Sequence, residues 1–250
     1  MVDHLIRRIC WWLCLFVAPT ILVGIELFHP ADFTHNPGMY AYLCGPQPYA
    51  TEHRALAYWG PEWWFQLHMI QTPLVALVTA GLWQMLSVIG PAERVAPVLL
   101  AWAARGALLL FVTYYTVLDG IGGIALGKNI LTLQDLQLQG KITADQAQGA
   151  ILLLNTVWLD PWIGGIGSFV SLTGSWAVFA ASTLAAAALG LAGKAPWPAL
   201  LLLAGFGWVL HIAHVMPYGP VAFSLLILAA GWIRLFPDRF VWRPALTAAP

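Results

Sequence analysis

Long runs of apolar residues, separated by short turns rich in glycine and proline, repeat along the whole chain. A helix that crosses a membrane needs about 20 consecutive apolar residues, because it rises about 1.5 Å per residue through a hydrocarbon layer about 30 Å thick. The pattern predicts six such spans, near residues 9–29, 64–89, 97–126, 163–192, 197–216 and 219–236. No internal repeat separates them, so residues 1–250 are interpreted as a single polytopic membrane domain.

The composition supports the same interpretation. Hydrophobic residues make up 60% of the 250 residues and charged residues only 9%, whereas soluble domains contain about 25% charged residues. The mean hydropathy is +0.76. We therefore expect an all-α integral membrane protein that is surrounded by the lipid bilayer. The 11 basic and 11 acidic residues balance, and this balance gives no reason to expect a nucleic-acid partner.

The charged residues predict how the spans are oriented. Numbering the two sides of the membrane by alternation places eight of the eleven basic residues on the side of the two termini: Arg7, Arg8, Arg94, Arg105, Lys194, Arg234, Arg239 and Arg243. Basic residues gather on the cytoplasmic side of membrane proteins. The sequence thus predicts cytoplasmic termini, a multi-pass protein of the inner (plasma) membrane, and two longer connections on the periplasmic or extracellular side.

One of these outer connections contains a further helix signal. Thr143 is followed three residues later by Gln146, which is the spacing of a helix N-terminal capping box. The apolar run that follows is too short to cross a membrane. We expect an additional interfacial or re-entrant helix near residues 144–159 on the outer side.

Acidic residues and histidines within the predicted spans are few, and all lie towards the outer side. An ionisable side chain in a membrane costs several kcal/mol unless it is paired, so each is a candidate functional residue. The set consists of Glu26, His29, His68, Asp119, His211 and His214, and the polar Gln71 accompanies it. Each also has a purely structural explanation, because a histidine or carboxylate near a span end can bond to backbone groups or to water.

The spacing of these residues suggests a shared pocket. Glu26 and His29, and likewise His211 and His214, are three residues apart and would share a helix face. Imidazole and carboxylate groups are ligands of zinc, iron and copper. The first hypothesis is a membrane-embedded metal-dependent enzyme that acts on a hydrophobic or lipid-like substrate at the outer side of the bilayer. Its predicted metal ligands are His29, His68, His211, His214 and Glu26, with Asp119 and Glu26 as catalytic groups.

Two other hypotheses stay open. In one, the chain is an electron-transfer subunit in which two histidines, with His68 and His211 as the leading pair, ligate haem b axially beside a quinone. In the other, it is a transporter, or an accessory subunit that binds other membrane subunits, although no inverted repeat is evident. Glycines surround the polar residues, notably Gly120, Gly122, Gly123 and Gly127. Small residues of this kind allow close helix packing or make room for a cofactor or an acyl chain.

Overall fold

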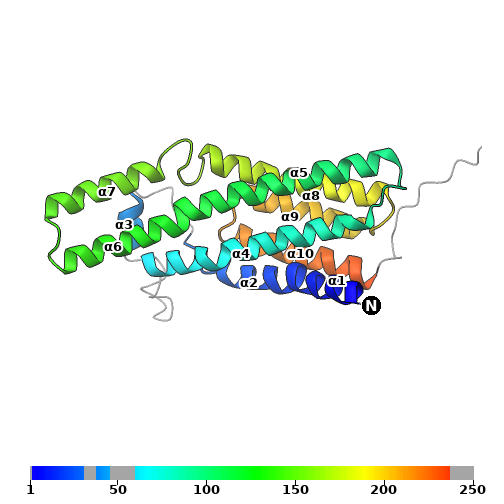
Figure 1. Cartoon of the computed structure of the whole chain (residues 1–250), viewed down its shortest axis with the longest axis horizontal. Helices are drawn as coiled ribbons and strands as arrows, with labels where there is room; N and C mark the ends of the chain where they lie inside the picture. Colours follow the sequence, from blue (N-terminus) through cyan, green and yellow to red (C-terminus); the bar gives the residue numbers. More distant parts are fainter. Residues whose placement is uncertain (1, 31–37, 46–59, 237–250) are drawn as a thin grey trace, which may run out of the picture.

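The computed structural model describes residues 2–30, 38–45 and 60–236, and within them the chain is helical apart from its connections (Figure 1). The helices are α1 (Val2–Trp12), α2 (Ala18–Glu26), α3 (Met39–Cys44), α4 (Pro61–Met85), α5 (Val95–Leu118), α6 (Leu126–Leu138), α7 (Ala144–Trp158), α8 (Phe169–Leu191), α9 (Trp197–Ile212) and α10 (Tyr218–Leu235). Two π-helical turns, η1 (Leu13–Val17) and η4 (Asp119–Ala125), join α1 to α2 and α5 to α6 without a break. The predicted all-α fold class is therefore confirmed for the described residues.

Among the described residues, five helices are long and apolar enough to cross a membrane: Leu5–Glu26, Pro61–Val88, Val95–Leu138, Phe169–Leu191 and Tyr218–Leu235. They match five of the predicted spans. The remaining predicted span, 197–216, is shorter in the structure, because α9 ends at Ile212 after 16 residues. The fourth predicted span also starts later than expected, because α8 begins at Phe169 and not at residue 163.

The third apolar segment continues well past its predicted end at residue 126. It forms one helix of 44 residues, Val95–Leu138, which spans about 66 Å at the usual helical rise. The glycines that follow Asp119 lie in the widened turn η4, and the helix continues through them. This length is about twice the roughly 30 Å thickness of a bilayer core, so the helix is longer than a single crossing needs.

The C-terminal part of the long helix, α6, pairs with α7 to form a hairpin, and α3 lies against it (Figure 1). The predicted extra helix near 144–159 thus has a counterpart in α7, and the capping box is confirmed: Thr143 Oγ1 accepts from the Gln146 backbone N–H at 3.2 Å. Whether α7 lies at the membrane surface stays a prediction.

The N-terminus, the α4–α5 turn, the α8–α9 turn and the end of α10 lie together at the end of the bundle opposite the hairpin (Figure 1). Gln84 Nε2 donates to the Arg7 carbonyl at 2.7 Å, and Arg94 donates to the Leu191 carbonyl at 2.9 Å. Lys194 forms an ion pair with Glu93 at 2.8 Å. This end therefore collects most of the basic residues of the predicted cytoplasmic side, while Arg239 and Arg243 lie outside the described residues.

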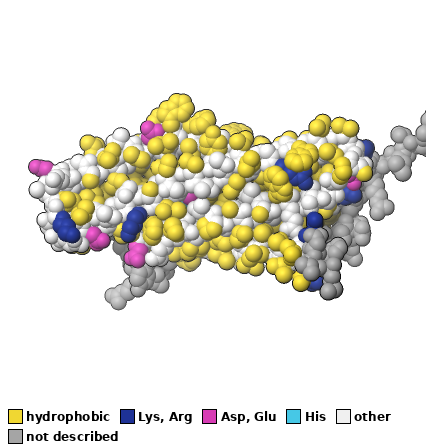
Figure 2. All heavy atoms as spheres, in the orientation of Figure 1, with side chains coloured by type: hydrophobic (Ala, Val, Ile, Leu, Met, Phe, Trp, Pro, Cys, Tyr) yellow, Lys and Arg dark blue, Asp and Glu magenta, His cyan; other side chains and the backbone are white. Residues whose placement is uncertain are grey.

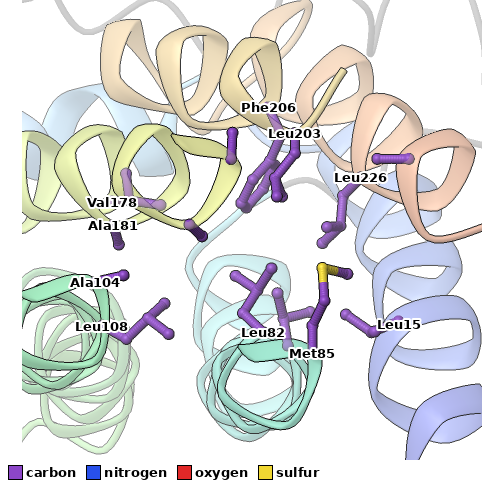
Figure 3. Packing of buried hydrophobic residues seen from close by; sticks show 14 of the residues in the cluster. Leu15, Leu82, Met85, Ala104, Leu108, Val178, Ala181, Leu203, Phe206 and Leu226 are labelled. Carbon is purple, nitrogen blue, oxygen red and sulfur yellow. The ribbon is translucent and has the colours of Figure 1, made fainter. Parts of the chain in front are cut away.

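On the face that Figure 2 shows, many hydrophobic side chains are exposed between the two ends, and most of the charged side chains lie towards the ends. Inside the bundle, apolar residues from six helical segments pack together (Figure 3). α8 contributes mainly alanines to this core, among them Ala181, Ala185 and Ala188. Small residues let neighbouring helices approach closely where lipid supplies no hydrophobic driving force, and α8 accordingly packs along both α5 and α9.

Gly207 is a point of very close approach between α9 and α8. A Cβ atom at this position would lie 1.7 Å from Ser182 Oγ and 2.8 Å from the Val178 carbonyl oxygen. We expect Gly207→Ala to destabilise the protein by about 1–3 kcal/mol, the usual cost of overpacking, measured as a lower melting temperature in detergent. Gly205→Ala is the matched control, because its Cβ would meet only Leu225 at an ordinary 3.5 Å. Equal melting temperatures for both variants would contradict this account of the contact.

Candidate functional site

Three histidines from three separate chain segments meet inside the bundle. His29 follows the end of α2, His68 lies in the second turn of α4, and His214 lies between α9 and α10. The ring of His29 is in edge contact with both others, with centroid separations of 5.3 Å to His68 and 5.1 Å to His214. His29 and His68 are 2% and 3% exposed, and His214 is partly buried.

The three imidazoles line one cavity of about 20 Å³, which we call the histidine cavity. Asp119, in η4, also lines it, and Trp158 and Ile166 close it on the side of α7. A volume of this size holds about one water-sized species. The structure thus brings together four of the six ionisable residues singled out in the sequence, at the place where helix α5 widens into a π-helical turn. Such turns are frequent at functional sites.

The two buried histidines are held in a defined orientation. His68 Nδ1 lies 2.7 Å from the Trp64 carbonyl oxygen, and His29 Nδ1 lies 2.7 Å from the Pro30 carbonyl oxygen. A carbonyl oxygen only accepts, so both rings donate through Nδ1. In the neutral ring the lone pair is then on Nε2. This is the arrangement in which metal-binding histidines are usually fixed by a neighbouring acceptor.

Gly123 makes room for the His68 ring. A Cβ atom added to Gly123 would lie 2.2 Å from two ring atoms of His68, Cγ and Cδ2. The neighbouring Gly122 accepts a hydrogen bond from Trp64 Nε1 at 3.0 Å, which ties α4 to η4. The glycines of this turn therefore permit the close contact that places His68 in the histidine cavity.

His211 and His214 do not share a helix face, contrary to the sequence-based expectation. The helix ends at Ile212, and Ala213 is extended, with φ −166° and ψ 153°. His211 instead packs among aromatic rings of α8 and α9, with centroid separations of 4.2 Å to Trp176 and 5.9 Å to Trp208. Of this predicted pair of ligands, only His214 lies at the histidine cavity.

Glu26 lies beside the cavity rather than in its wall. Its side chain is fully buried, and Gln71 Nε2 donates to Glu26 Oε1 at 2.7 Å. The same amide contacts the hydroxyl of Tyr115. Glu26 therefore belongs to a buried Glu26–Gln71–Tyr115 cluster next to the histidine cavity.

Asp119 is 1% exposed. The Thr72 hydroxyl lies 3.0 Å from Asp119 Oδ2 and 2.8 Å from the His68 carbonyl oxygen, so it links the carboxyl to the His68 backbone. Among the described residues, neither Asp119 nor Glu26 is paired with a lysine or arginine. A buried carboxyl without such a partner either binds a proton or faces another cation.

Sequence reasoning missed Tyr115 and Thr72. Both were accessible through helical spacing, since Tyr115 precedes Asp119 by four residues and Thr72 follows His68 by four, which places each pair on one helix face. Neither residue is ionisable at neutral pH, so a search for intramembrane charges passes over them.

Comparisons with known proteins add no assignment: no family model, no curated protein and no solved structure matches this chain. Among the described residues, no group of three or more His, Cys, Asp or Glu side chains is arranged to hold a metal ion as the side chains stand. Function is therefore inferred from the chemistry and placement of the histidine cavity.

Proposed function

We propose that the chain is a membrane-embedded metal-dependent enzyme, and that His29, His68 and His214 bind one divalent transition-metal ion beside Asp119. The observation that carries the proposal is the convergence of these four side chains on one small cavity inside the bundle. Three neutral imidazoles with a nearby carboxylate are a typical donor set for a catalytic zinc site, which keeps one position for water or substrate. Iron and copper also accept this donor set.

The three imidazoles are suitable donor groups for such an ion, and their separations are close to those of rings that share one metal ion. Two imidazoles bound to one zinc ion through Nε2 have ring centroids about 5 Å apart, and His29 lies at 5.3 Å and 5.1 Å from its two neighbours. The donor atoms do not converge as they stand, so binding requires the rings to turn towards a common point. His214 is the residue best placed to do so, because it lies in a connection and, unlike His29, is only partly buried.

A divalent ion would also balance the buried acids. Bound there, it would polarise a carbonyl group or an attacking water. The Asp119 carboxylate lines the same cavity and would accept a proton from that water, with the Thr72 hydroxyl holding the carboxyl in place. Glu26 would act through Gln71 and Tyr115 rather than as a ligand. Of the two catalytic groups predicted from the sequence, Asp119 would thus act on the water directly, and Glu26 would act through its neighbours.

The haem hypothesis fits the cavity less well. Axial ligands of a haem group lie on opposite faces of a macrocycle, whereas the ring of His29 is in direct edge contact with the rings of both His68 and His214. A cavity of about 20 Å³ has room for an ion or a water molecule but not for a porphyrin. His211, one of the two leading axial ligands, lies apart from the cavity.

We further propose six spans, in which α9 crosses the membrane in addition to the five longer helices, and both termini lie in the cytoplasm. α9 packs against α8 and α10, and an even number of spans agrees with the N-terminus and the end of α10 lying at the same end of the bundle (Figure 1). The basic residues at that end favour the cytoplasmic side. The histidine cavity would then lie towards the outer, periplasmic or extracellular, side of the bilayer.

Elemental analysis of the purified protein tests the metal proposal. We expect about one equivalent of zinc, iron or copper per chain and no visible Soret band. An ion bound at 100 times its Kd stabilises a fold by about 2.7 kcal/mol. Its removal by a chelator should therefore lower the melting temperature by about 5–10 °C for a chain of this size. Protein that contains no metal, even after incubation with each of the three ions, would refute the proposal, and a Soret band would favour haem instead.

A further inference from the structure

Arg105 is a cationic side chain within a membrane-spanning helix, and the proposed metal chemistry gives it no role. It lies in the N-terminal half of α5, whereas Asp119 and the histidine cavity lie just beyond the C-terminal end of the same helix. Arg105 follows the first residue of α5 by ten positions, or about 15 Å along the helix axis. An arginine at such a position is costly unless it is paired or reaches the bilayer surface.

The side chain of Arg105 extends towards the end of the bundle that holds the N-terminus. Its Nη2 donates to the Leu86 carbonyl oxygen at 3.0 Å. Leu86 begins η3 (Leu86–Val88), the last helical turn before the α4–α5 connection at that end (Figure 1). Long basic side chains reach in this way from a helix within the membrane to the level of the lipid headgroups.

Two tryptophans flank the guanidinium on the outer surface of the bundle. Arg105 Cζ lies 4.9 Å from the ring centroid of Trp102, which precedes it by three residues on α5, and 5.6 Å from that of Trp83 on α4. The two rings are 61% and 43% exposed. Tryptophan is enriched where a membrane protein meets the headgroup layer. The guanidinium therefore lies at a surface that lipid covers.

The charge of Arg105 is not neutralised by the protein groups around it. A guanidinium has five N–H donors, and the Leu86 carbonyl oxygen accepts one hydrogen bond. Within residues 2–30, 38–45 and 60–236, no carboxylate forms an ion pair with Arg105. A carbonyl dipole and two ring faces carry no net negative charge. The remaining donors suit a phosphate group, whose oxygens match the fork of a guanidinium.

The surface next to Arg105 continues towards the bilayer centre as an open apolar face. Leu109, one helical turn further along α5, is 61% exposed. Between them lies Gly106, where an added Cβ atom would have no other atom within 4 Å. A lipid whose headgroup lies at Arg105 could therefore place an acyl chain along this face without displacing a side chain.

We propose that Arg105, Trp102 and Trp83 bind the phosphate group of an anionic phospholipid, taken from the bilayer leaflet at the end of the bundle that holds the N-terminus. One acyl chain of this lipid lies along Gly106 and Leu109. A net negative headgroup is preferred because Arg105 brings one uncompensated positive charge. The inference goes beyond the proposed metal site and is independent of it.

Native mass spectrometry of the purified protein, titrated with dioleoyl phosphatidylglycerol in a neutral detergent, tests the inference. We expect one tightly bound lipid per chain, with about a fivefold preference over dioleoyl phosphatidylcholine, since one arginine near the headgroups contributes about this factor for an anionic lipid. Arg105→Gln should remove the preference. Trp102→Leu should weaken binding of the first lipid about two- to fivefold, because the cation–π contact that orients the guanidinium is lost.

Arg94→Gln and Trp197→Leu are the matched controls. Arg94 is an exposed arginine at the same end of the bundle, and Trp197 is a 52% exposed tryptophan at the start of α9. Both variants should bind the first lipid as the unmodified protein does. Equal losses in the Arg94 and Arg105 variants would reveal a general charge effect and overturn the inference. Displacement of the lipid by inorganic phosphate would indicate a site for a free anion and would also overturn it.

Discussion

His214→Ala is expected to abolish metal binding, whereas His211→Ala should leave one metal equivalent per chain. The two residues are three positions apart, yet His214 lines the histidine cavity and His211 packs on Trp176. Loss of a residue that supports a ligand commonly lowers metal affinity about 10–100-fold, so loss of a ligand itself should lower it by about 100-fold or more. Elemental analysis after dialysis, together with titration of the metal-free protein, measures both effects.

The pair of variants also tests whether α9 ends at Ile212, as the structure shows, or continues to residue 216, as the helical spacing of the two histidines suggested. Had α9 continued to residue 216, both histidines would face the same pocket, and both substitutions would remove metal. Equal metal content in the two variants would therefore contradict the described end of α9 or the proposed role of His214. Circular dichroism of both variants checks that the helices are retained.

Gly123→Ala is expected to lower metal affinity about 10–100-fold, although it removes no ligand. The added Cβ would lie 2.2 Å from two ring atoms of His68. Since this is far shorter than a van der Waals contact, the His68 ring must leave its position or η4 must shift. Either change moves a ligand away from the common point. Titration of the metal-free variant with zinc, followed by competition with a chelator of known affinity, measures the loss.

Gly120→Ala is the matched control, because it lies in the same turn and has no atom within 4 Å of an added Cβ. It should bind metal as the unmodified protein does. If both alanine variants lose metal to the same extent, the effect belongs to the π-helical turn as a whole and not to the contact with His68.

The apolar pattern predicted the helices well, because a span of about 20 apolar residues has few alternatives in lipid. The capping box at Thr143 likewise predicted the start of α7 to the residue. Helix ends that fall within an apolar stretch of sequence were harder to predict. α9 ends at Ile212 in the middle of an apolar stretch, and the run of glycines after Asp119 widens the helix instead of ending it.

Membership of the candidate site depended on tertiary packing. Sequence identified His29, His68, Asp119 and His214 as unusual for a membrane helix, and they do meet at one cavity. It could not separate His211 from His214, because that distinction depends on the extended conformation of a single residue, Ala213. Nor could it place Glu26 outside the cavity wall, because the position of Glu26 depends on the contact of its carboxyl with Gln71 on another helix.

The hairpin of α6 and α7 has a practical consequence for structure determination. A membrane protein of 27.3 kDa offers little mass outside a detergent micelle for particle alignment in electron cryomicroscopy. Here α6 continues directly from the helix that carries Asp119, so a label attached beyond the bundle would be rigidly connected to the site. The turn between the two helices, where Gly140 has a positive φ of 64°, is the natural place to insert a short epitope or a helical fusion partner.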